Sequence, residues 1–206
     1  MVQSTAQTVT FDAFVEWYPE TGRYELINGT IVEMFPTGPH ENVVGFLAVE
    51  VGYEIRRSSL LYSMPKTYLV RSPDRESGYQ PDLLVVDPQA LDAEPLWPKQ
   101  SIITMGSSIK LAVEVVSTNW KNDYLRKLAD YEDLGISEYW IVDYRALGAV
   151  RYIGLPKVPI VSVYALNQTG EYELRQFKGT EKIESLLLPE LALTVDRIVI
   201  AAGADL

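Results

Sequence analysis

The chain has 206 residues, of which 47% are hydrophobic and 22% charged, ordinary values for a globular protein with a sizeable core. It has no cysteine and a single histidine, His40, which excludes disulfides, thiolate metal sites and zinc sites built on several imidazoles. Its formal net charge of −10 argues against a protein whose whole surface grips nucleic acid, because phosphate contacts need clustered Lys and Arg. A local basic groove stays compatible with that charge, and any metal would have mainly oxygen ligands, as Mg²⁺, Mn²⁺ and Ca²⁺ prefer.

The sequence has no sign of membrane insertion or export. No segment approaches the roughly 18 apolar residues of a transmembrane helix. The N-terminal residues lack the basic start and apolar core of a signal peptide, so we expect a cytoplasmic protein. The length predicts a single domain over residues 1–206, with the polar residues 1–10 loosely held.

In chain order, the first half of the sequence predicts a short helix at 11–17, a hairpin at 23–34, a loop at 36–39 and a long helix at 41–57. Asp12 is expected to cap the short helix. Asn28 and Gly29 stand between two apolar-alternating runs, which is the strongest short signal for a β-hairpin. The long helix is predicted from apolar residues that recur at helical spacing.

The second half alternates strands with one more helix. Strands are predicted at 61–70, 81–86, 109–116, 138–142, 150–152, 161–166 and 172–177, a long loop at 87–108, a helix at 121–134, and terminal pieces at 181–184 and Ile198. The segment 109–116 is apolar on both faces apart from two charges, as expected of a central strand, and Gly135 is expected to end the helix. This order predicts an α/β (α+β) fold with a mixed β-sheet flanked by helices, an N-terminal hairpin and a C-terminal β extension.

Two carboxylates begin or interrupt predicted strands. Glu114 lies between Val113 and Val115, where an unpaired carboxylate is expensive to bury unless a metal, a cation or hydrogen bonds compensate it. A structural salt bridge is the alternative for this residue. Asp82 follows Pro81 at the start of an apolar strand, a position where Asp commonly only tethers a turn.

Lys127 lies on the apolar face of its predicted helix. It comes three residues after Tyr124 and four before Tyr131, and a lysine on a buried face needs a partner. Glu114 on the preceding strand can be that partner, and extension of the side chain past the rings to solvent is the alternative. Two carboxylates on neighbouring strands could hold Mg²⁺ while Lys127 steadies a water and the developing phosphoryl charge.

The order of these residues resembles the PD-(D/E)XK nuclease superfamily and, more narrowly, its Uma-type family of restriction endonucleases. The similarity spans roughly residues 12 to 195, and its supporting stretches are Tyr24 to Gly29, His40, Gln80-Pro81-Asp82, Glu114 to Ser117, Lys127 with Tyr131, and Glu138 to Asp143. It implies a restriction-endonuclease-like core. The superfamily's lysine usually comes two residues after the acid, where this chain has Val116, so the resemblance implies that Lys127 supplies the ammonium from the following helix.

The resemblance also implies a function and a site. It implies a Mg²⁺- or Mn²⁺-dependent endonuclease that hydrolyses phosphodiester bonds in DNA. Metal ligands would be Asp82, Glu114 and the Val115 carbonyl, with Lys127 as the third catalytic residue, and the site would be lined by Glu25, His40, Gln80 and Ser117. Ser117 would orient Glu114 or cap the Lys127 helix, and Glu50 is a weaker candidate.

Several alternatives stay open at this point. Glu25 could face solvent from its hairpin, and His40 could be a polar group in the first turn of a helix. The chain could also be a non-catalytic binding or assembly protein with a nuclease fold, or it could hydrolyse a smaller phosphate compound. A homodimer is open by analogy with enzymes that cut both strands. A local basic groove could use Arg56, Arg57, Lys66, Arg71, Lys110 and Lys121.

Overall fold

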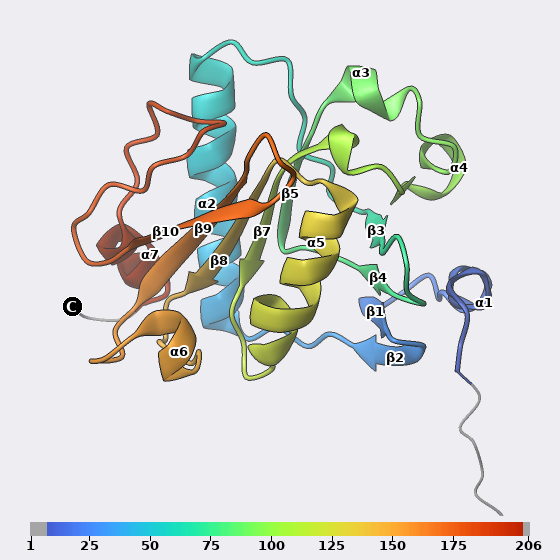
Figure 1. Cartoon of the computed structure of the whole chain (residues 1–206), viewed down its shortest axis with the longest axis horizontal. Helices are drawn as coiled ribbons and strands as arrows, with labels where there is room; N and C mark the ends of the chain where they lie inside the picture. The colour runs from blue at the N-terminus through green and yellow to red at the C-terminus, as the bar shows by residue number, and fades with distance from the viewer. Residues whose placement is uncertain (1–7, 204–206) are drawn as a thin grey trace, which may run out of the picture.

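The computed structural model describes residues 8–203, which form two five-stranded sheets with helices around them (Figure 1). The larger sheet has the strand order β10-β9-β8-β7-β5, with parallel pairing only between β7 and β8. Its strands are β5 (Leu83–Val86), β7 (Ile109–Val115), β8 (Glu138–Asp143), β9 (Ile160–Leu166) and β10 (Tyr172–Phe177). The smaller sheet, β2-β1-β4-β3-β6, comprises β1 (Tyr24–Ile27), β2 (Thr30–Glu33), β3 (Leu69–Arg71), β4 (Gly78–Tyr79) and β6 (Ile102–Ile103).

Helices cover both faces of the larger sheet. The long helix α2 (Gly38–Arg57) and α7 (Val195–Ala201) pack on one face, and α5 (Leu128–Leu134) with the π-helical segment η2 (Asn122–Lys127) lies in front of the other (Figure 1). Because side chains alternate along a strand, Val113 and Val115 of β7 enter the α2 core, whereas Ala112 and Val116 enter the α5 core. The same alternation directs Glu114 toward α5. The predicted fold class is therefore confirmed.

The N-terminal hairpin forms as predicted. Asn28 and Gly29 connect β1 to β2 with φ angles of 48° and 73°, the left-handed pair that a tight hairpin turn requires. The short helix α1 (Phe11–Trp17) also forms, but the Thr10 side chain caps it by accepting a hydrogen bond from the backbone of Ala13. The prediction of Asp12 as the cap is therefore wrong by two residues.

The predicted boundaries need several corrections in the first half of the chain. Residues 8–10 are tied down rather than loose, since the Val9 N–H donates to the Gly29 carbonyl, and residues 1–7 lie outside the described residues. Helix α2 begins at Gly38, inside the predicted loop, because Pro39 fits a first helical turn. Of the predicted strand 61–70, the described structure keeps only β3 and one bridge between Ser63 and Val86.

Further corrections concern the short segments after Asp87. The predicted loop 87–108 contains α3 (Pro88–Leu91), α4 (Trp97–Gln100), β6 and the 3-10 turn η1 (Gly106–Ser108). The predicted strand 150–152 is instead the helix α6 (Val150–Ile153), and Ile198 belongs to α7, which packs on α2. The helix predicted over 121–134 is present, but its first part is π-helical, and Gly135 ends it at φ 83° as expected. No helix within residues 8–203 has the length and apolarity to cross a bilayer.

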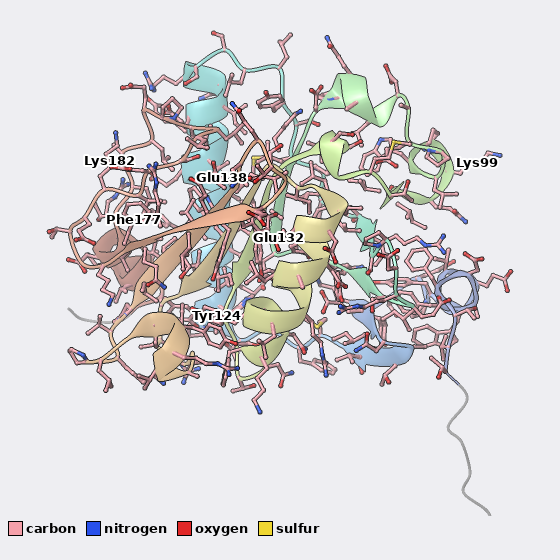
Figure 2. All side chains as sticks on the ribbon, in the orientation of Figure 1. Lys99, Tyr124, Glu132, Glu138, Phe177 and Lys182 are labelled. Atoms are coloured by element: carbon pink, nitrogen blue, oxygen red, sulfur yellow. The ribbon has the colours of Figure 1, made fainter. Side chains whose placement is uncertain are left out.

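The two ends of the larger sheet differ in chemistry. Figure 2 shows Glu138 at the upper end, where β8 begins, and Tyr124 at the lower end, where the helix after β7 begins. The lower end is also where α2 starts and where the hairpin of the smaller sheet approaches (Figure 1). The carboxyl end of β7 is therefore surrounded by elements from three parts of the chain.

Candidate functional site

Lys127 is a fully buried cation at the carboxyl end of β7. Its ammonium Nζ lies 2.9 Å from Glu25 Oε1, 2.9 Å from Glu114 Oε2 and 3.7 Å from Asp123 Oδ1. Nζ also lies 5.7 Å from the centre of the Tyr79 ring, within the range of a cation–π contact. These carboxylates outweigh the loss of hydration and raise the pKa of Lys127, so the ammonium stays charged. The predicted pair of Lys127 with Glu114 is present, and extension to solvent is excluded because Lys127 is 1% exposed.

The segment η2 sets the position of Lys127 relative to β7. Single turns of π-helix are uncommon and often mark functional sites, because the wider turn redirects side chains. In this segment Asp123 and Lys127 both point into the buried site, while Leu125 and Arg126 are exposed. The face of this helix that the sequence predicts to be buried, which includes Lys127, is therefore the buried face in the structure.

Glu114 is the most deeply placed acid of the site. Its Oε2 faces Lys127, and its Oε1 accepts a hydrogen bond of 3.0 Å from the Tyr131 hydroxyl. Burial raises the pKa of Glu114 well above its usual value, since desolvation and three neighbouring carboxylates outweigh the attraction of Lys127. Burial likewise raises the pKa of Asp123 to about 7. The site thus holds more carboxylate than its buried ammonium can neutralise.

Asp82 is fixed beside the end of β7 by two contacts with its Oδ2. The backbone N–H of Val115 donates to this oxygen at 2.8 Å, and His40 Nε2 lies 3.3 Å from it. His40 Nε2 also lies 3.0 Å from the Val115 carbonyl. Burial lowers the pKa of His40, but Asp82, Glu41 and the Val115 carbonyl together outweigh it and raise the pKa. The other oxygen of Asp82, Oδ1, has the Arg23 guanidinium 3.8 Å away.

Lys127, Glu114, Asp123, Asp82 and His40 all line a cleft of about 250 Å³. Its lining comes mainly from the loop between β2 and α2, the loop between β7 and η2, and the residues after β8. The lining residues are Glu33 to Thr37, His40, Asp82, Glu114 to Asn119, Asp123, Lys127, Tyr144 and Arg145. The three predicted catalytic residues therefore share one cleft that is open to small groups.

Comparisons with known proteins identify the family and the fold of this chain. A family model described as "Uma2: Putative restriction endonuclease" matches residues 11–196. The chain belongs to the Uma2 family. A crystal structure of "a putative nuclease belonging to DUF820 from Anabaena variabilis ATCC 29413" is similar to this Uma2 protein with a TM-score of 0.70 and 16% identity, over 94% of this chain and 99% of that chain. At that identity the likeness establishes the fold alone, and curated proteins give no match.

Two of the proposed lining residues of this Uma2 protein are in the site. Glu25 is 1% exposed and accepts the Gln80 backbone N–H at 2.9 Å as well as contacting Lys127, so a solvent-facing position is excluded. His40 is also buried and contacts Asp82. Its place is in the first turn of α2, and its ring is directed into the cleft lining.

Other predicted residues have different roles. The backbone N–H of Gln80 donates to Glu25. Its side chain donates to the Tyr18 hydroxyl, accepts a hydrogen bond of 3.4 Å from Arg23 Nε, and lines a separate apolar cavity instead of the cleft. Ser117 lines the cleft but neither contacts Glu114 nor caps a helix; its hydroxyl accepts the Asn119 N–H at 3.4 Å. Glu50 pairs with Arg197 of α7, outside the cleft.

The six basic residues considered for a local groove do not line the cleft. Arg57 pairs with Glu54, and Lys110 pairs with Asp87, at other places on the molecule. Of the six residues considered, Lys121 is the one that lines a cavity adjoining the cleft.

Sequence reasoning missed three contributors. Asp123 lies four residues before Lys127, and that spacing on a helix would have identified it. Arg23 precedes the hairpin and Arg145 follows β8, and no local pattern indicates that either approaches the site.

The donor set of the site fits a hard divalent cation. No group of three or more His, Asp or Glu side chains within residues 8–203 is arranged to enclose a metal by itself. Asp82, Glu114 and the Val115 carbonyl are all oxygen donors, and Mg²⁺ usually takes one or two carboxylates and completes its coordination with water and substrate. Burial among other carboxylates raises the pKa of Glu114. A divalent cation at this position would offset the excess negative charge.

Proposed function

We propose that this Uma2 protein is a divalent-metal-dependent nuclease that hydrolyses phosphodiester bonds in DNA. The observation that carries the proposal is the buried ammonium of Lys127, held 2.9 Å from both Glu25 and Glu114 at the edge of a cleft that also holds Asp82. A buried lysine with several carboxylate partners is costly to assemble for stability alone. An arrangement of this kind is typical of sites where charge develops during a reaction.

Each residue has a separate role in this proposal. Asp82, Glu114 and the Val115 carbonyl would hold Mg²⁺ or Mn²⁺, which supplies positive charge for the phosphate and a more acidic water when bound. Lys127 is charged and fixed, so it can orient an attacking water and stabilise negative charge on the phosphoryl oxygens. Glu25 and Asp123 keep the ammonium in that position.

The surrounding residues fix the geometry of the acids. Tyr131 donates to Glu114 and the Val115 N–H donates to Asp82, so neither carboxylate can rotate without losing a hydrogen bond. His40 bridges Asp82 and the Val115 carbonyl from the first turn of α2. Arg145 is exposed in the cleft lining and can contact a phosphate next to the one that reacts.

The test is a nuclease assay on linear, circular and single-stranded DNA with Mg²⁺, with Mn²⁺ or with a chelator. We expect metal-dependent cleavage that falls by at least about 100-fold in Asp82→Asn, Glu114→Gln and Lys127→Met. Asp92→Asn is a matched control, because this aspartate is exposed and lies outside the cleft. Cleavage that persists in the three variants would overturn the assigned residues. Absence of both cleavage and Mn²⁺ binding by calorimetry would favour the alternative, a nuclease-fold binding protein.

A further inference from the structure

Phe35 is an exposed aromatic residue at the mouth of the cleft. Its side chain is 80% exposed, and it lies in the same lining as Asp82 and Lys127. A single exposed apolar side chain is common on protein surfaces. The position of Phe35 beside buried catalytic candidates distinguishes it from the other exposed hydrophobic residues, such as Tyr53 and Leu61, which do not line the cleft.

The backbone around Phe35 is anchored on both sides. The Met34 N–H donates to the Arg23 carbonyl at 2.8 Å, and the Glu41 N–H donates to the Thr37 carbonyl at 3.0 Å where α2 begins. The loop between these anchors is short and contains Pro36, which restricts the backbone further. The ring is therefore presented at the cleft by a fixed segment, and such pre-organisation lowers the entropy lost on binding.

The charges of the cleft disfavour binding through phosphates alone. Four acids line it, at Glu33, Asp82, Glu114 and Asp123. The cations of the lining are Lys127, which its carboxylate partners hold, and Arg145, which is exposed. Proteins that hold duplex DNA by its backbone usually neutralise several phosphates with Lys and Arg. A divalent cation in the proposed site would attract the scissile phosphate, but the lining has few side-chain cations for the neighbouring phosphates. A contact with the base would therefore add affinity that phosphate contacts do not supply.

We infer that Phe35 stacks on an unpaired nucleobase next to the scissile phosphate, so the cleft takes single-stranded in preference to duplex nucleic acid. This inference rests on the proposed nuclease function. Aromatic rings bind single strands because every base presents a flat face, and in a duplex these faces are covered by neighbouring base pairs.

Fluorescence anisotropy with a short labelled oligonucleotide tests the inference. The single strand and its duplex are titrated with the full chain in Ca²⁺ at constant ionic strength. We expect the single strand to bind more tightly than the duplex, and Phe35→Ala to weaken that binding by roughly tenfold. Phe35→Trp should retain it. Tyr53→Ala is the matched control, because Tyr53 is an exposed aromatic residue on α2, roughly 22 Å along the helix from its first residue. This variant should bind the single strand with the affinity of the wild type.

Three results would overturn the inference: equal affinity of Phe35→Ala and the wild type, equal affinity for duplex and single strand, or no binding of single strands. A change of oligomeric state in Phe35→Ala with unaltered nucleotide binding would also overturn it, by assigning the ring to a second copy of the chain. Cleavage assays on the same two substrates separate this inference from the proposed function. Phe35-dependent binding without any cleavage would reject the nuclease activity and keep the stacking site.

Discussion

Lys127 illustrates how a charged residue becomes part of a protein core. Removal of an ammonium from water costs several kcal/mol, and here three carboxylates within 4 Å and a tyrosine ring compensate it. The compensation is mutual, since each of these acids would be destabilised without the cation. Lys127 is therefore tied to stability as well as to the proposed chemistry.

The first prediction concerns this mutual dependence. Lys127→Met leaves Glu25, Glu114 and Asp123 buried without their shared cation, and we expect the free energy of unfolding to fall by about 3–5 kcal/mol. Urea denaturation followed by tryptophan fluorescence measures the change. Lys99→Met is the control, because Lys99 is exposed and its replacement should alter stability by less than about 0.5 kcal/mol.

A second variant makes the same prediction sharper. Glu25→Gln removes one of the carboxylates that Lys127→Met leaves without a cation. The double variant should therefore be more stable than Lys127→Met, although Glu25→Gln alone should destabilise the wild type. Equal stability of Lys127→Met and the wild type would contradict the buried ion cluster. Simple additivity of the two substitutions would contradict the contact between Lys127 and Glu25.

At the residue scale, local pattern predicted part of the site and could not predict the rest. Glu114 and Lys127 were identifiable because each interrupts an apolar face of its own element. The contact of Glu25 with Lys127 depends on the smaller sheet packing beside η2, which no local signal records. Gln80 was predicted to line the site because it is close to Asp82 in sequence, but its side chain lines a separate cavity and is linked to the site through Arg23.

At the element scale, β8 is stabilised at its beginning by a buried acid that lies outside the cleft lining. Glu138 accepts hydrogen bonds from the Trp140 indole at 2.6 Å and the Ser185 hydroxyl at 2.7 Å, and from the backbone N–H groups of Leu186 and Leu187. Figure 2 shows Glu138 at the upper end of the larger sheet, whereas Tyr124 of η2 lies at the lower end. This acid therefore fastens the segment before α7 to the central sheet.

The second prediction is that Glu138→Leu loosens this segment. The substitution leaves four donors without their acceptor, and buried donors of this kind cost about 1–3 kcal/mol each when unpaired, so we expect an overall loss of at least about 2 kcal/mol. Limited proteolysis should cut first near residues 185–188, before the rest of the chain unfolds. Glu184→Leu is the control, since its side chain is exposed and pairs only with Arg175. Identical cleavage patterns for the two variants would contradict the role of Glu138.

Element length decides how well the sequence predicts the fold. The long helix α2, the central strand β7 and the strands β8 to β10 were predicted because each repeats its apolar pattern over several positions. The region 87–108 and the turn α6 were missed because elements of two to four residues have no period to detect. The π-helical geometry of η2 could not be distinguished from an α-helix in the sequence, since both place Lys127 on the buried face.

At the scale of the whole molecule, charge is unevenly placed in a chain of net charge −10. Four acids meet at one end of the larger sheet, at Glu25, Asp82, Glu114 and Asp123, while Lys127 is the fully buried cation among residues 8–203. Loss of hydration on burial, and to a lesser extent repulsion among these carboxylates, opposes folding and raises the pKa values of Glu114 and Asp123. Any cation that binds the folded site and not the unfolded chain must stabilise the protein.

The third prediction follows from this linkage. At a Mn²⁺ or Mg²⁺ concentration about 100 times the dissociation constant, binding should add about 2.7 kcal/mol to the free energy of unfolding. For a protein of this size that corresponds to an increase in Tm of roughly 5–10 °C, measurable by calorimetry. A potassium chloride solution of equal ionic strength separates site binding from general screening of the negative charge. Asp82→Asn removes one ligand and should lose most of the increase, whereas Asp92→Asn should retain it, because Asp92 is exposed and outside the cleft. An equal increase in Tm for the two variants would show that divalent ions act on the surface charge alone and would remove the metal from the proposed site.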